Sequence, residues 1–120
     1  MVESDEKLIT KAGSIIRKRY KEGFHEVGAA LRTKSGNEFS AVHIAICAEA
    51  IAIGMAAAEG DTEIDTIVAV NSQGEVVSPC GMCRELISDY SPEAKVIIKE
   101  NNKHEIVAIS ELLPKKYKRI

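Results

Sequence analysis

Three stretches of the chain have the hydrophobic pattern of helices. In residues 7–20 the apolar positions recur at spacings of three and four, which predicts an amphipathic helix with one face to bury. Residues 47–59 are apolar on almost every side and end before Gly60, a common helix stop. Such a helix must be covered on most of its circumference, so we expect it in the core or at a subunit interface. A third helix is predicted over residues 80–90.

Shorter apolar runs predict strands. In residues 25–32, Val27, Ala29 and Leu31 alternate with Gly28 and Ala30, so the face that carries Gly28 and Ala30 can admit a closely packed helix. Further strands are predicted over residues 38–44, 66–70, 95–99 and 105–109. The order helix, strand, strand, helix, strand, helix, strand, strand favours an α/β fold with one mixed five-stranded sheet covered by helices.

Length and charge limit the classes of protein that this chain can be. With 120 residues, 45% of them hydrophobic, the chain fits one domain spanning residues 1–120. The net charge is −2, and Lys and Arg concentrate only in residues 115–119, so we expect no nucleic-acid duplex as a partner. Residues 41–58 form the longest nearly uncharged run, but this run contains Glu49, so we expect no membrane helix. The N-terminus lacks the pattern of a secretory signal, which favours a cytoplasmic protein.

The cysteines are the first candidates for chemistry. An odd number, three, without an export signal suits metal binding or redox chemistry better than disulfides. Cys80-Gly81-Met82-Cys83 at a helix start places both sulfurs on one face, within reach of a single ion. On its own this motif also fits a redox dithiol, or half of a four-ligand structural zinc site.

The third cysteine narrows this choice. Cys47 opens a predicted helix, and three ligands leave a zinc position open for water, as catalytic sites do. If His43 completed the set, the result would instead be a closed Cys3His module without activity. A redox protein that uses Cys80 and Cys83 is a third hypothesis, and it leaves Glu49 beside Cys47 unexplained.

Glu49 is the candidate catalytic residue. Two segments match the signature of zinc deaminases: Cys47-Ala48-Glu49 and Pro79-Cys80-Gly81-Met82-Cys83. The first metal ligand of this signature is either histidine or cysteine, and here it is Cys47. The glutamate of this signature moves protons: from the attacking water, to a ring nitrogen and then to the departing ammonia. The alternative is that an acid in the first turn only stabilises the helix.

Three thiolates would carry more negative charge than one Zn²⁺ neutralises. Helix N-termini at Cys47 and Cys80 stabilise thiolates. Arg84, directly after Cys83, is placed to hydrogen-bond a ligand sulfur, the alternative being an exposed helix arginine.

These motifs resemble those of the small cytidine deaminase family, including its blasticidin-S deaminase branch. Supporting matches are Val27-Gly28-Ala29-Ala30-Leu31, like the first strand of the family, and Glu111-Leu112-Leu113-Pro114, like its C-terminal element. The resemblance implies a three-layer α/β/α fold and one Zn²⁺ per subunit. It also implies hydrolytic deamination of a nucleoside or base with a cytosine-like ring, as in pyrimidine salvage. The family is commonly homotetrameric, with sites that borrow residues from neighbouring subunits.

The chain departs from the family between the second strand and the zinc helix. Where the family carries an Asn and a Glu that hold the ribose hydroxyls, this sequence has His43 and Ala45, and most of the following loop is absent. A methyl group cannot accept hydrogen bonds, so the sugar side of the site differs.

Several further residues are candidates for contact with the substrate. His43 is either such a contact or an ordinary strand histidine, and His25 lies near a base-contacting aromatic position of the family. Ser78 and Pro79 could aim carbonyls at the exocyclic amine or form a simple turn. The candidate contacts are His25, His43, Ala48, Ser78 and Pro79. We expect His104 to be solvated, and Tyr117 either to reach a neighbouring subunit or to lie in an exposed tail.

Overall fold

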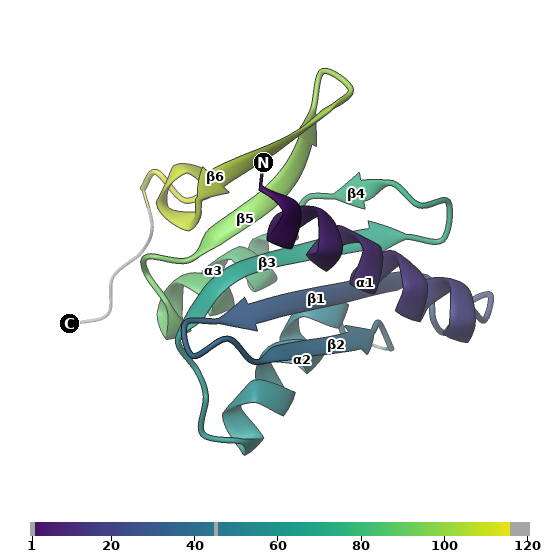
Figure 1. The fold of residues 1–120 in the computed structure, drawn as a ribbon, viewed down its shortest axis with the longest axis horizontal. Helices are drawn as coiled ribbons and strands as arrows, with labels where there is room; N and C mark the ends of the chain where they lie inside the picture. The colour runs from purple at the N-terminus through teal and green to yellow at the C-terminus, as the bar shows by residue number, and fades with distance from the viewer. Residues whose placement is uncertain (1, 45, 116–120) are drawn as a thin grey trace.

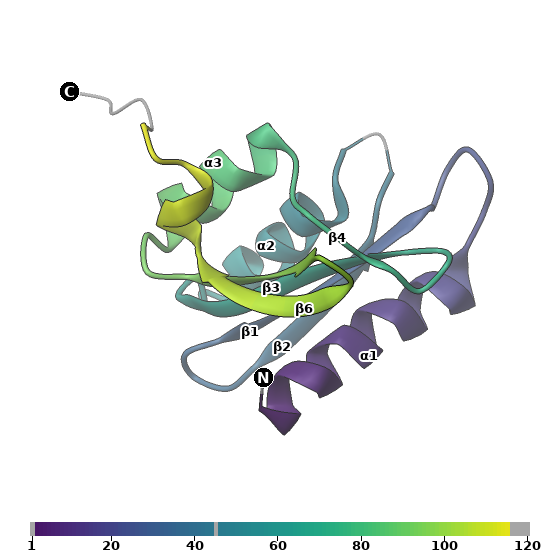
Figure 2. The same ribbon diagram turned by 90° about the horizontal axis from the view of Figure 1, so that it is seen from above.

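A central sheet divides the molecule into three layers (Figures 1 and 2). Helix α1 (Glu3–Arg19) covers one face, and α2 (Ala48–Ala58) and α3 (Gly81–Tyr90) cover the other. This computed structural model describes residues 2–44 and 46–115, so Ala45 and Tyr117 lie outside the described residues. The predicted three-layer α/β/α architecture is confirmed.

Within the residues that the structure describes, the sheet has six strands. Five follow the order β2–β1–β3–β5–β6, and β4 pairs with β3 beside this path. The strands are β1 (Val27–Thr33), β2 (Glu38–Val42), β3 (Ile64–Asn71), β4 (Val76–Val77), β5 (Lys95–Glu100) and β6 (Lys103–Ala108). Strands β3 and β5 run parallel, and the other described pairs are antiparallel. The five predicted strands are all present, and the short β4 is additional. A 3₁₀ helix, η1 (Ile109–Leu112), follows β6.

The two faces of the sheet carry separate apolar clusters. Val68 and Val70 of β3 pack with Leu8 and Ala12 of α1, whereas Ile67 belongs to the cluster that includes α2 and α3. Successive side chains of a strand point to opposite faces, so β3 serves both layers.

Gly28 allows α1 to approach β1 closely, as the sequence predicts. A Cβ atom at this position would lie 2.5 Å from the backbone oxygen of Ala12 and 2.9 Å from Ile15. Both separations are shorter than real contacts allow, so a glycine is required here.

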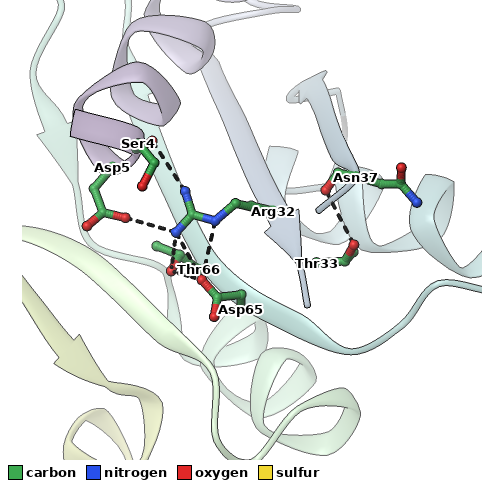
Figure 3. A network of polar contacts seen from close by, with 7 residues as sticks. All are labelled: Ser4, Asp5, Arg32, Thr33, Asn37, Asp65 and Thr66. Carbon is green, nitrogen blue, oxygen red and sulfur yellow. Dashed lines mark hydrogen bonds and ion pairs between the residues drawn. The ribbon is translucent and has the colours of Figure 1, made fainter. Parts of the chain in front are cut away.

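Helix α1 begins at Glu3 rather than at residue 7, where the apolar stripe starts. The reason is a tertiary contact, shown in Figure 3: Arg32 Nη2 donates to Asp5 Oδ1 and to Asp65 Oδ2, both at 2.9 Å. Arg32 Nη1 also donates to the backbone oxygen of Ser4 at 3.2 Å. The arginine therefore joins the first turn of α1 to β1 and β3.

Both helices that carry the cysteines begin at one end of the sheet. Val27 pairs with Asn71, Gly28 with Val42, and β4 lies beside the end of β3. Helix α2 follows β2 and α3 follows β4, so their N-termini meet at this end (Figure 1). Within the described residues, each helix is too short or too polar to cross a bilayer.

Candidate metal centre

The three cysteines converge at the N-termini of two helices. Cys47 is the N-cap residue of α2, Cys80 is the N-cap residue of α3, and Cys83 lies in the first turn of α3. The sulfurs of Cys47 and Cys80 are 3.2 Å apart, and all three sulfurs lie within 4.8 Å of one another. The fold thus brings together the predicted ligand set.

This sulfur cluster fits zinc. Zinc–sulfur bonds of about 2.3 Å in a tetrahedron place the sulfurs about 3.8 Å apart, which lies inside the 4.8 Å limit and needs only a small widening of the Cys47–Cys80 pair. Within the described residues, the group that could hold an ion contains these three cysteines and neither His43 nor Glu49. The Cys3His alternative is therefore not favoured.

The thiols differ in how readily they ionise. Hydrogen bonding from the backbone N–H of Cys83 lowers the pKa of Cys80, against a smaller effect of burial. Burial raises the pKa of Cys47 and, more strongly, that of Cys83, whose side chain is fully buried. A buried thiolate needs a compensating cation, and a divalent metal ion supplies that charge.

Arg84 hydrogen-bonds two backbone carbonyl groups in this structure. Its Nε donates to the backbone oxygen of Pro79 at 2.9 Å, and its Nη1 donates to that of Leu112 at 3.4 Å. No hydrogen bond from Arg84 to a sulfur occurs among the described residues. The guanidinium holds the turn before α3 against η1, and backbone N–H groups rather than this side chain stabilise the Cys80 thiolate.

Glu49 lies in the first turn of α2, two residues after Cys47, and only 5% of its surface is exposed. Burial raises the pKa of its carboxyl group, and a hydrogen bond with backbone N–H partly offsets that effect. A buried carboxyl with a raised pKa is suited to accept a proton and to release it again.

A pocket opens beside the cysteines. Its walls come from β1, the end of β2, the start of α2 and the segment from β4 to α3. The lining residues are Val27, His43, Cys47, Ala48, Glu49, Val77, Ser78 and Cys80. The candidate substrate contacts His43, Ala48 and Ser78 thus meet here, whereas His25 and Pro79 are not part of the lining. The sequence analysis did not identify Val27 and Val77 as apolar walls of the pocket. Val27 begins the motif of the first strand, and Val77 lies two residues before the motif that starts at Pro79.

His25 instead supports His43. The His25 Nδ1 atom lies 2.9 Å from the backbone oxygen of His43, which can only accept, so Nδ1 carries the proton and donates. In turn, Glu26 N–H donates to Nδ1 of His43 at 3.2 Å. As expected, His104 is exposed, on β6.

Comparison with known proteins agrees with this geometry. Residues 2–100 match the family described as the cytidine and deoxycytidylate deaminase zinc-binding region. A blasticidin-S deaminase of Bacillus cereus is 47% identical over 132 residues, covering 98% of this chain and 94% of that protein. A cytidine deaminase of Halalkalibacterium halodurans is 32% identical, covering 74% of each chain.

A solved structure has the same fold. The crystal structure of cytidine deaminase from Mycobacterium leprae superposes with a TM-score of 0.79 at 25% identity, covering 96% of this chain and 100% of that one. Sequence, fold and sulfur cluster agree on a hydrolytic deaminase that holds one Zn²⁺ per subunit. The chain therefore belongs to the family of zinc-binding cytidine and deoxycytidylate deaminases.

Proposed function

We propose that this chain removes the exocyclic amino group from a cytosine-like ring by hydrolysis and releases ammonia. The observation that carries the proposal is the placement of Glu49: a buried carboxyl that lines the same pocket as the ligand cysteines Cys47 and Cys80. Three protein ligands leave one zinc position open, and a closed structural site would use four.

The protein's own groups account for the proton transfers. A Glu49 carboxylate oxygen accepts a proton from the attacking water and delivers it to a ring nitrogen. The hydroxyl that remains from the water bonds to the carbon that bears the amine. Glu49 then takes the proton of this hydroxyl and passes it to the amine nitrogen, the C–N bond breaks, and a ring carbonyl and ammonia are formed. Zinc, when bound, supplies the Lewis acid that makes water nucleophilic at neutral pH.

The proposed substrates are cytidine, deoxycytidine or a related nucleoside such as blasticidin S, which would place the enzyme in pyrimidine salvage or in the detoxification of a nucleoside. The names of the similar proteins support this range. Val27 and Val77 offer apolar walls to a flat ring, and His43 and Ser78 are the polar groups beside it.

We further propose that the enzyme works as a homo-oligomer, with a tetramer favoured. The pocket has a volume of about 140 Å³. Small-molecule sites in proteins start at roughly 300 Å³, so one chain would enclose the reacting ring and leave the remainder of the substrate uncovered. A second copy could complete it. We place the enzyme in the cytoplasm because none of its three cysteines forms a disulfide, as is usual for proteins under reducing conditions.

An ammonia-release assay of the zinc-loaded protein tests the reaction. Cytidine, deoxycytidine, blasticidin S and free aminopyrimidines are compared for wild type, E49Q and the control E59Q, at the exposed acid that caps the C-terminus of α2. We expect E49Q to keep one zinc per chain and to lose about 10²- to 10⁴-fold in kcat. We expect E59Q to match wild type. Tightly held zinc without ammonia release from any compound would support the structural alternative instead.

A further inference from the structure

Two of the three cysteines are open to small molecules and the third is not. Cys80 is exposed and Cys47 is half-buried, and both line the pocket. Cys83 is fully buried and is not part of the pocket lining. A reagent that enters from solvent therefore meets the sulfurs of Cys47 and Cys80. This accessible pair comes from two different helices, because each of the two residues is the N-cap of its own helix.

The sulfurs of the accessible pair are also close enough to react with each other. They lie 3.2 Å apart, within hydrogen-bond distance for sulfur. A disulfide bond is about 2.0 Å long, whereas two sulfur ligands of one zinc ion stand about 3.8 Å apart. The observed separation lies between these two values. Small movements of the N-termini of α2 and α3 therefore lead either to metal binding or to a disulfide.

The sequence alone suggests a different pair. Cys80 and Cys83 form a C-x-x-C motif, and such motifs often act as redox dithiols. In the structure, however, Cys83 is closed to solvent, and the sulfur 3.2 Å from that of Cys80 belongs to Cys47. Exposure and distance thus favour a bond between the two helices over a bond within α3.

We propose that Cys47 and Cys80 form a reversible disulfide in the presence of a low-molecular-weight disulfide such as oxidised glutathione, and that this bond prevents metal binding. The disulfide uses two of the three ligands, and Cys83 alone does not hold the ion. The deaminase is then switched off by oxidation and restored by reduction. This inference concerns the ligand set and does not depend on which substrate is deaminated.

The reaction consists of two thiol–disulfide exchanges. The Cys80 thiolate attacks one sulfur of the small disulfide, the S–S bond of that molecule breaks, and one small thiolate leaves. The Cys47 thiolate then attacks the Cys80 sulfur of this mixed disulfide, the bond between the two cysteines forms, and the second small thiolate leaves. The cysteines lose two electrons in total, and the small disulfide gains them. An excess of reduced thiol reverses both steps.

The methionines of the chain allow the pairing to be mapped. Cyanogen bromide cleaves after methionine, and Met55 and Met82 separate the three cysteines. Each cysteine then lies on its own fragment: residues 2–55, 56–82 and 83–120. Zinc-loaded wild type is incubated with oxidised glutathione, the remaining thiols are alkylated, and the fragments are identified by mass spectrometry. Zinc that leaves the protein is measured in the same sample with a chromogenic chelator.

We expect bound zinc to fall by about tenfold or more, because one remaining cysteine is too few to hold it. The fragments 2–55 and 56–82 should be joined by a disulfide, and the fragment 83–120 should be alkylated. Excess dithiothreitol should separate the joined fragments and restore zinc binding. A disulfide between fragments 56–82 and 83–120, a bond between two chains on a non-reducing gel, or unchanged zinc and thiols would each overturn the inference.

Two matched variants test the pair independently of the mapping. C83S keeps both members of the accessible pair, whereas C47S removes one, and the fold of each is checked by circular dichroism. With oxidised glutathione, C83S should form the disulfide, and C47S should keep glutathione attached to Cys80. A folded C83S without the disulfide, or a C47S that forms a disulfide as fast as wild type, would contradict the proposed pair. Ammonia release by the reduced enzyme would be unaffected by that failure, so the proposed function is judged separately.

Discussion

Asp65 is one of the two carboxylates that hold Arg32, the residue that joins α1 to the sheet. Burial alone would raise its pKa, but hydrogen bonds from Arg32 and Thr66 outweigh that effect and lower the pKa. A carboxyl with a lowered pKa in the folded state stabilises the fold above its unfolded pKa of about 3.9. This contribution is lost as the pH falls through the lower, folded-state pKa.

The substitution D65N should therefore destabilise the protein in a pH-dependent way. We expect the free energy of unfolding to fall by about 0.5–1 kcal/mol at pH 7, as for a partly exposed ion pair. The difference from wild type should shrink as the pH falls below about 4. Urea unfolding at several pH values measures it, with E63Q, at an exposed carboxyl, as the control. A loss that does not change with pH would contradict the ion-pair explanation.

At the residue scale, the sequence predicts the chemistry better than the supporting contacts. Cys47, Glu49 and the Cys80–Cys83 pair follow from the residue types and spacing that a metal and a proton carrier require. The role of Arg84 could not be predicted in this way. Whether a guanidinium meets a sulfur or the carbonyl of Pro79 depends on the exact path of the turn before α3.

At the scale of elements, the contact between α1 and β1 depends on Gly28. We expect G28A to lower the free energy of unfolding by about 1–3 kcal/mol, because the added methyl group meets the backbone of α1 rather than a movable side chain. Thermal or urea unfolding measures this change.

Gly13 provides the matched control on α1. A Cβ at Gly13 meets the end of the flexible Arg17 side chain at 3.0 Å, and alanine favours a helix over glycine. G13A should therefore be neutral or stabilising. A G28A variant as stable as G13A would contradict the close packing of α1 on β1.

The element boundaries that the sequence does not predict depend on tertiary contacts. The first turn of α1 is polar, and its buried Asp5 is stabilised by Arg32, a partner 27 residues away. Strand β4 is two residues long, too short to show a periodicity. Strand β6 begins earlier than predicted because Asn101 and Asn102 adopt positive φ angles in a tight turn, which asparagine tolerates.

At the scale of the whole molecule, one apolar surface on α2 is left open by residues 2–44 and 46–115. Helix α2 buries Ala52, Ile53 and Ala56, but Gly54 is exposed and Met55 is 43% exposed. The sequence indicates that this helix needs cover on most sides, and the described part of one chain buries only its sheet-facing side. This is the basis for proposing that copies of the chain associate through α2.

The substitution M55E should weaken that association. We expect wild type to sediment well above its monomer mass of 13.0 kDa and M55E to shift towards the monomer, because a buried charge without a partner is costly. K103E, on the exposed part of β6, is the control. A wild type that sediments as a monomer at micromolar concentration would contradict the proposed oligomer.

The central claim is that three cysteines hold zinc and leave one position open to water, and counting the ligands of the metal tests it most directly. X-ray absorption of the purified protein counts the ligands of the metal. We predict one zinc per chain, with three sulfurs at about 2.3 Å and one oxygen at about 2.0–2.2 Å. A fourth ligand from a protein side chain, or purified protein without stoichiometric zinc, would contradict a catalytic site with a position open to water.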